Sequence, residues 1–167
     1  PASRGDATKE EQIMIQKGSK IAIGSDHAGY DMKEAIKDQL QADGYDVIDM
    51  GTHDKNSCDY PDFAAAVAHA VAQGQAPVGI IVCSTGIGVS MTANKVHGIR
   101  AALVHHAYEA EMTRRHNDAN VLCLGANITG PAIALNAVKT FLATDFEGGR
   151  HQRRVDKMMA IETTPSH

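Results

Sequence analysis

Apolar residues in this chain occur in two alternating patterns: short continuous runs and longer stretches with a helical period. The runs predict buried strands, because a parallel strand covered by helices on both faces is apolar almost throughout. They lie at residues 21–24, 45–50, 78–83, 99–104 and 120–124. The stretches predict helices at residues 31–43, from Pro61 onward, and at 108–115, 131–142 and about 150–161.

Strands that alternate with helices through short connections predict a three-layer α/β domain. We expect this domain to cover residues 19–162, with a flexible polar extension at 1–18 and a tail at 163–167. Such sheets bind ligands at the carboxyl ends of their strands, near the point where the strand order switches. The loops after the strands are therefore where functional residues are expected.

Composition excludes several functional classes. The chain has 167 residues, 43% of them hydrophobic, which fits one globular domain. Its net charge of -4 argues against nucleic-acid binding, which needs a basic surface. No apolar run approaches the roughly 20 residues that span a bilayer, and the polar start does not resemble a signal peptide. Three cysteines without CxxC spacing favour a reducing compartment, so we expect a cytoplasmic location.

Two loops carry candidate chemistry. After the first predicted strand, the adjacent Asp26 and His27 can bind sugar hydroxyls, although such a pair in a turn is more often structural, since Asp also caps helices. A phosphate-loop motif is excluded here, because Tyr30 and Asp31 occupy the positions of its Lys and Ser/Thr. After the third strand, small residues at 84–90 allow backbone N–H groups to surround a phosphate or an enediolate oxyanion.

The second loop begins at Cys83, which is either a small core residue or a thiolate base. Its segment Gly86-Ile87-Gly88 is half of a dinucleotide fingerprint, but Met91 replaces the third glycine, so no such cofactor is predicted.

Histidine and arginine residues supply further candidates. His116, at the end of a predicted helix, is either a proton shuttle or a capping charge. In the last helix, Arg150, His151 and Arg154 lie close enough to converge on one phosphate, and a solvated charge run is the alternative. The pair at residues 105–106 lacks further ligands at a recognised spacing, so no metal site is predicted.

Seven segments, in order from about residue 20 to 161, resemble the type B ribose-5-phosphate isomerases, whose relatives include allose- and galactose-6-phosphate isomerases. The segments are Ser25-Asp26-His27-Ala28-Gly29, Asp59-Tyr60-Pro61, Cys83-Ser84-Thr85-Gly86-Ile87-Gly88, Ala93-Asn94-Lys95, Gly98-Ile99-Arg100, Arg115-His116-Asn117-Asp118-Ala119-Asn120 and Gly148-Gly149-Arg150-His151-Gln152-Arg153-Arg154. Each motif is weak by itself, but their order makes the resemblance strong.

The resemblance implies a Rossmann-like α/β/α domain with a five-stranded parallel sheet and no cofactor or metal. It also implies a homodimer with shared active sites, with a tetramer as a further option. Cys83 would move a proton between two substrate carbons, Thr85 would stabilise the oxyanion, and His116 would help to open the sugar ring. The implied contacts to a phosphorylated sugar are Asp26, His27, Tyr60, Ser84, Gly86, Gly88, Asn117, Arg150, His151 and Arg154.

Three positions depart from relatives in this family. Some relatives use a Glu where Val89 stands, which strengthens the assignment of Cys83 as the base. Many have Gly at the place of Ser84 and Arg at the place of Asn127, so one phosphate contact is in doubt. The alternatives are an isomerase of a six-carbon sugar phosphate and a non-catalytic sugar-phosphate-binding module, which would need the arginines but neither base nor shuttle.

Overall fold

The computed structural model describes residues 15–165. It contains a five-stranded parallel sheet with the strand order β2-β1-β3-β5-β4. The strands are β1 (Lys20–Ser25), β2 (Asp46–Asp49), β3 (Val78–Cys83), β4 (Ala101–Leu103) and β5 (Val121–Gly125). The helices are α1 (Tyr30–Ala42), α2 (Tyr60–Ala72), α3 (Ile87–Ala93), α4 (Ala107–Asn117), α5 (Pro131–Ala143) and α6 (Arg150–Ala160), followed by the 3-10 turn η2 (Ile161–Thr163).

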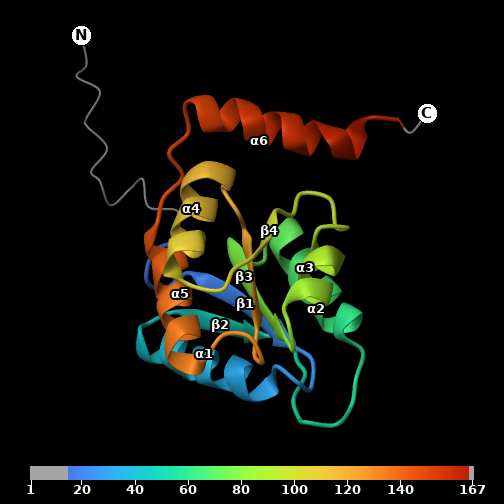
Figure 1. Ribbon diagram of the computed structural model, residues 1–167, viewed down its shortest axis with the longest axis vertical. Helices are drawn as coiled ribbons and strands as arrows, with labels where there is room; N and C mark the ends of the chain where they lie inside the picture. The colour runs from blue at the N-terminus through green and yellow to red at the C-terminus, as the bar shows by residue number, and fades with distance from the viewer. Residues whose placement is uncertain (1–14, 166–167) are drawn as a thin grey trace.

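The helices form two layers, as the sequence predicted. Helices α1, α4 and α5 cover one face of the sheet, while α2 and α3 cover the other (Figure 1). Alternate residues of each strand point to opposite faces, so Ile80 joins the core beneath α1 and α5, and Ile81 joins the core beneath α2. Both strand faces are buried, which explains the continuous apolar runs.

Two elements differ from their predicted form. Helix α3 was not predicted as a separate element, because its sequence is rich in glycine and small polar residues; Val89 and Ala93 nevertheless bury one side of it. Strand β4 is three residues long, shorter than the predicted run of 99–104. Ile99 and Val104 flank this strand and are buried without being part of it.

Helix α6 stands apart from the two layers. It crosses the molecule beyond the amino ends of the strands and packs chiefly against α4 (Figure 1). A cavity of about 530 Å³ lies between this helix and the body, lined in part by Ile99, Met159 and Ile161. Val155 is buried, but Met158 is 44% exposed. The apolar side of α6 is therefore only partly covered.

The division at residue 18 stays a prediction, and most of the extension lies outside the described residues. Ile15, however, is buried in the core beneath α1, and the Lys17 ammonium donates to the Asp43 carbonyl at 2.6 Å. Ordered packing thus begins before residue 19. Among residues 15–165, no helix is long and apolar enough to cross a membrane.

Candidate active site

The strand order switches between β1 and β3, and the loops after these two strands meet there. The Asp26 N–H donates to the Val82 carbonyl at 3.3 Å. Gly29 lies so close that a Cβ atom at this position would be 2.5 Å from the Val82 carbonyl oxygen. Glycine at 29 therefore allows the two loops to close against each other, at the edge where α/β sheets bind ligands.

Cys83 is the last residue of β3, and its side chain is buried at this edge of the sheet. The Gly86 N–H donates to the Cys83 Sγ at 3.1 Å. Gly86 holds a left-handed φ of 77°, which directs its N–H back toward the sulfur and starts α3. Such a donor stabilises negative charge on the sulfur, which a thiolate base requires.

Cys123, on the neighbouring strand β5, differs from Cys83 in its surroundings. Burial raises the pKa of the Cys123 thiol far above its usual range, and the nearby Cys83 raises it further. Cys123 is fully buried and remains a protonated core residue. Of these two cysteines, Cys83 alone combines the strand end with an N–H donor to its sulfur.

The contacts of His27 define its tautomer. Its Nδ1 accepts a hydrogen bond from the Cys58 backbone N–H at 3.2 Å. A backbone N–H can only donate, so Nδ1 carries the lone pair and the proton of the neutral ring is on Nε2. Asp26 accepts the Gly29 N–H at 3.0 Å through one carboxylate oxygen. This bond holds the turn before α1 and is not the helix cap that the sequence left open, because Gly29 is the N-cap residue of α1 and no side chain caps that helix.

The candidates from the loop after β3, and the residues that contact this loop, lie at the same edge of the sheet. The Asn127 side-chain amide donates to the Ser84 hydroxyl at 2.9 Å, and the Thr85 hydroxyl accepts the Ile87 N–H at 3.2 Å. The ring of Tyr60 lies over Gly88, where a Cβ atom would be 2.6 Å from the ring. These residues, together with Asp26, His27, Cys83 and Gly86, form what we call the carboxyl-edge group.

His116 and Asn117 lie at the opposite edge. They end α4, shortly before the first residue of β5. The five steps between the six residues of β3, at about 3.3 Å each, put roughly 16 Å between the two edges. His116 and the α6 residues therefore do not meet Cys83 within one chain. His116, Asn117, Arg150, His151 and Arg154 are called the amino-edge group below.

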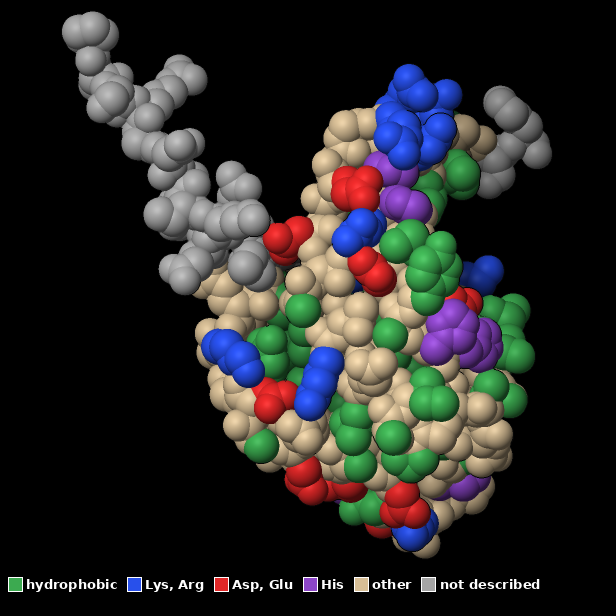
Figure 2. Space-filling view, turned by 60° about the vertical axis from the view of Figure 1, so that its left-hand side comes forward, with side chains coloured by type: hydrophobic (Ala, Val, Ile, Leu, Met, Phe, Trp, Pro, Cys, Tyr) green, Lys and Arg blue, Asp and Glu red, His purple; other side chains and the backbone are tan. Residues whose placement is uncertain are grey.

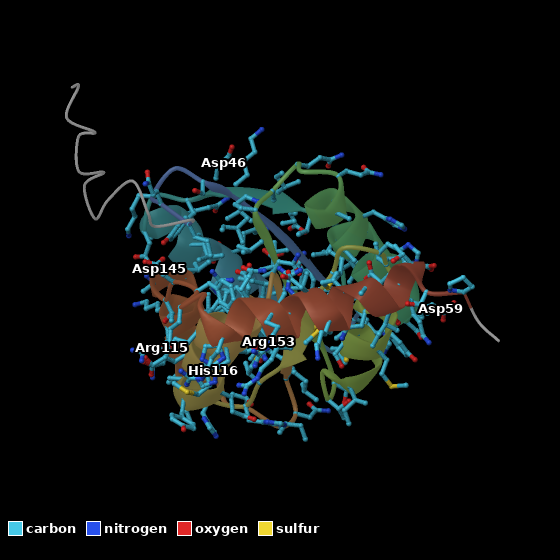
Figure 3. The ribbon with its side chains drawn as sticks, turned by 90° about the horizontal axis from the view of Figure 1, so that it is seen from above. Asp46, Asp59, Arg115, His116, Asp145 and Arg153 are labelled. Atoms are coloured by element: carbon cyan, nitrogen blue, oxygen red, sulfur yellow. The ribbon has the colours of Figure 1, made fainter. Side chains whose placement is uncertain are left out.

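Within the amino-edge group, the rings of His116 and His151 stack, with centroids 4.3 Å apart and an interplanar angle of 12°. Figure 3 shows His116 beside the first turns of α6. His151 lies on the buried side of the helix, whereas Arg150 and Arg154 are exposed. Basic and histidine side chains gather at this end of the molecule (Figure 2). The convergence of both arginines on one phosphate stays a prediction.

His151 is neutral near pH 7. Burial lowers the pKa of its imidazole, and Arg150, His116 and Arg154 lower it further, while Glu147 acts in the opposite direction. A neutral ring offers a lone pair or an N–H group to a ligand without adding charge.

Comparison with known proteins places the chain in a family. The family model described as Ribose/Galactose Isomerase matches residues 21–158. The chain belongs to this family. It is 46% identical over 143 residues to ribose-5-phosphate isomerase B of Escherichia coli, covering 86% of this chain and 96% of that protein.

Solved structures of the ribose/galactose isomerase family have the same fold. Ribose-5-phosphate isomerase B of Clostridium thermocellum matches with a TM-score of 0.85 and 53% identity, over 86% of this chain and 97% of that one. The Mycoplasma genitalium enzyme, solved with bound ribulose 5-phosphate, matches with a TM-score of 0.84 and 42% identity, over 87% and 97% of the two chains.

Two of the departures from the family pattern are in direct contact. Ser84 and Asn127 share the side-chain hydrogen bond described above, and the Asn127 N–H also donates to the Ser84 carbonyl at 2.9 Å. Asn127 thus fixes the loop after β3 through two hydrogen bonds to Ser84, and its neutral amide adds no charge there.

Sequence analysis missed the residue that holds the His116 turn. Arg114 is fully buried and donates to Asp118 at 2.9 Å, to the Ala119 carbonyl at 2.8 Å and to the Thr144 carbonyl at 3.1 Å. Asp118 has a left-handed φ of 47°, and the hydrogen bond from Arg114 to its carboxylate helps to hold this conformation. The available signal was the i, i+4 spacing of Arg114 and Asp118 on one helix face.

Proposed function

We propose that this chain is an aldose–ketose isomerase that interconverts ribose 5-phosphate and ribulose 5-phosphate through an enediolate. The observation that carries the proposal is Cys83, whose sulfur accepts a backbone N–H beside Asp26 and His27 at the strand-order switch. Family membership supports the reaction, and the Mycoplasma genitalium relative binds the ketose product.

The reaction moves one proton between two carbons. The Cys83 thiolate removes the proton from C2 of the open-chain aldose and returns it to C1, so the electron pair of the broken C–H bond passes through the enediolate. Negative charge develops on O1 of the substrate, and the Thr85 hydroxyl and the N–H groups of residues 84–86 stabilise it. The proton of the O2 hydroxyl passes to O1, and no electrons leave the sugar.

The other candidate residues open the sugar ring and bind the phosphate. His116 donates a proton to the ring oxygen of the furanose as its bond to C1 breaks, and the O1 hydroxyl gives up its proton to solvent. Asp26 and the Nε2–H of His27 hold the ring oxygen and hydroxyls. Asn117 binds the open chain, and Arg150, His151 and Arg154 bind the phosphate. Anchoring this non-reacting group positions the carbons against the base.

Because the two groups lie at opposite edges of one chain, we propose a homodimer in which the carboxyl edge of one subunit meets the amino edge of the other. The incompletely covered α6 supports this arrangement, since a second subunit would bury its apolar side. A tetramer of two such dimers remains compatible with it.

We also assign the protein to the cytoplasm and to the pentose phosphate pathway. The support is that Cys58, Cys83 and Cys123 are free thiols, as expected in a reducing compartment.

The first test is the conversion of ribose 5-phosphate by the purified protein in buffer containing EDTA, beside allose 6-phosphate and galactose 6-phosphate. Turnover of the pentose supports the proposal. Turnover of a six-carbon sugar alone would move the function to that substrate, with Asn127→Arg as the next variant. Failure of every sugar would indicate a binding module.

The second test mixes two inactive variants. Dimers of Cys83→Ala or of His116→Ala alone have no complete site. Subunit exchange between them gives mixed dimers in which one of the two sites combines an intact Cys83 with an intact His116. Random exchange should restore about a quarter of the wild-type activity for a two-fold dimer. Mixtures that stay inactive despite exchange, measured by native mass spectrometry, would contradict the shared site.

A further inference from the structure

Three side chains with metal-ligating atoms meet where α4 ends and α6 begins. They are His116 in the last turn of α4, Glu147 in the connection that follows α5, and His151 in the first turn of α6. One ligand atom from each lies within 4.8 Å of the other two. The segments come from different parts of the chain, so the cluster is produced by the fold.

His151 is the central member of the cluster. Its side chain is about 93% buried, since 7% of it is exposed. Its Nε2 is buried and has no hydrogen-bond partner among residues 15–165. The nearest acid oxygen, Oε2 of Glu147, is 3.3 Å away but does not meet hydrogen-bond geometry. A buried polar atom without a partner is costly, and an imidazole nitrogen with a free lone pair is a common metal ligand.

The donor set determines which metal fits. Two imidazoles and one carboxylate, with an open fourth position, are a ligand set that proteins use for Zn²⁺, whereas Mg²⁺ and Ca²⁺ prefer oxygen ligands. Zinc–nitrogen bonds of about 2.0–2.1 Å require the ligand atoms to approach to roughly 3.3 Å of one another. Glu147 is exposed and His116 is half-buried, so both can rotate toward His151.

We propose that His116, Glu147 and His151 form a Zn²⁺-binding site, and that zinc bound there reversibly inhibits the enzyme. Arg115, 3.7 Å from Glu147, also pairs with Glu111 at 2.7 Å and therefore releases Glu147 at little cost. The binding is independent of the proposed function. The inhibition rests on it, because His116 and His151 are the ring-opening and phosphate-binding residues that the metal would occupy.

The test of binding is calorimetric titration of the metal-free wild-type protein with ZnCl₂. We expect about one ion per chain. Glu147→Gln should weaken this binding at least about tenfold, and His151→Gln should do the same or more. The matched control is His105→Gln with His106→Gln, an exposed histidine pair beside Glu109 that should leave the affinity unchanged.

Cobalt identifies the ligand atoms. Titration with CoCl₂ should give d–d absorption bands without the intense near-ultraviolet band of thiolate ligation, and Glu147→Gln should weaken these bands. A thiolate band would move the metal to the cysteines and overturn the proposal. So would an affinity that falls in the control pair and not in Glu147→Gln.

Inhibition is measured separately by the turnover of ribose 5-phosphate. Zinc should lower the turnover with an inhibition constant equal to the dissociation constant, and EDTA should reverse the effect. Glu147→Gln should keep its basal turnover but require at least about tenfold more zinc for the same inhibition. Binding without inhibition would overturn the inhibitory role. Inactivity of the metal-free protein would instead count against the proposed function, because the titrations do not depend on turnover.

Discussion

Each edge of the sheet contains one fully buried cation, and the two differ in how well they are paired. At the carboxyl edge, the Lys33 ammonium contacts Asp49 at 2.9 Å, Glu34 at 3.1 Å and the Thr52 carbonyl at 2.6 Å. At the amino edge, Arg114 contacts one carboxylate, Asp118, and two carbonyls. Its Nη2 has no hydrogen-bond partner in the described part of the chain.

This difference indicates that the carboxyl-edge group is more completely fixed by contacts within the chain than the amino-edge group. The Lys33 cluster binds the Thr52 carbonyl, and the Thr52 N–H donates to the Ser25 carbonyl at 2.7 Å, so it braces the end of β1 directly before Asp26. At the amino edge, the turn after His116 is held by Arg114 and by Arg100, which donates to the Asn117 and Asp118 carbonyls, and α6 covers this edge incompletely. The contacts that fix the carboxyl edge are thus present within one chain, whereas the amino edge is the part that the partner subunit of the proposed homodimer would complete.

The largest expected effect comes from the chemistry of the carboxyl edge. Cys83→Ala removes the base, so kcat should fall roughly 10²–10⁴-fold, the usual contribution of a positioned proton-transfer group. The variant should still bind ribose 5-phosphate, because the phosphate contacts remain. Steady-state kinetics and calorimetry check both statements.

The matched control is Cys123→Ala, on the neighbouring strand. This variant should lose some stability and keep its turnover, since the Cys123 thiol of the wild type is buried and protonated. Full turnover in Cys83→Ala would contradict the assigned mechanism.

The next effect concerns the stability of the same edge. Asp49→Asn leaves the Lys33 ammonium buried beside one remaining carboxylate. We expect the free energy of unfolding to fall by about 3 kcal/mol, near the lower end for a broken buried pair, because Glu34 remains 3.1 Å away. Urea unfolding measures this change.

Asp31→Asn is the control for a surface pair. Its partner Lys55 is 65% exposed, and such pairs contribute about 0–1 kcal/mol. Equal losses in the two variants would show that the buried cluster does not brace the edge.

The fold was predictable from the sequence where a single periodicity dominated. The apolar run at 78–83 and the helical spacing at 131–142 coincide with β3 and α5 to within one residue. The bounds of helix α3 were not predicted, because glycine and small polar residues favour a loop and because the apolar contacts of this helix come from the neighbouring layer. Strand β4 is shorter than predicted, because Ile99 and Val104 beside it are buried without being part of the strand.

The site was predictable at the carboxyl edge, because parallel strands bring their ends together there. Cys83 and His27 follow that rule. The stacking of His116 on His151 and the pairing of Lys33 with Asp49 depend on contacts between distant segments, which no local spacing reveals. The separation of Cys83 from His116 follows from their places in the chain, since Cys83 ends a strand and His116 ends the helix that leads into the start of β5.

A smaller effect is expected at the amino edge. Arg114→Gln removes the donors to Asp118 and to the Ala119 carbonyl, and the free energy of unfolding should fall by roughly 1–3 kcal/mol. Because this arginine positions the turn that carries His116, kcat should fall more than KM rises. Arg114→Lys should restore part of both values.

Arg115→Gln is the adjacent control. Arg115 is exposed and pairs with Glu111, so its loss should change stability by less than about 1 kcal/mol. A kcat that stays normal in Arg114→Gln would mean that the partner subunit, and not this turn, orients His116.

The smallest effect is a pH dependence confined to the carboxyl edge. Hydrogen bonding to Lys37, with Lys33 adding, holds the pKa of Glu34 below its usual value although burial opposes this. Burial would raise the pKa of Asp49, but Lys33, the Gly51 N–H and Lys37 outweigh it and hold this pKa below its usual value as well. A carboxylate with a lowered folded-state pKa stabilises the fold above its unfolded pKa, and this stability is lost as pH falls through the folded value.

Glu34→Gln should therefore cost about 0.2–1 kcal/mol at pH 7, since its partly exposed carboxylate makes ion pairs of moderate strength. The difference from wild type should shrink as pH falls below about 4, where the wild-type carboxylate becomes protonated too. Urea unfolding at a series of pH values measures this convergence. Asp31→Asn, as the exposed reference, should show a smaller change at every pH. A Glu34→Gln difference that stays constant down to the acid limit would mean that packing, and not charge, is what Glu34 contributes to the carboxyl edge.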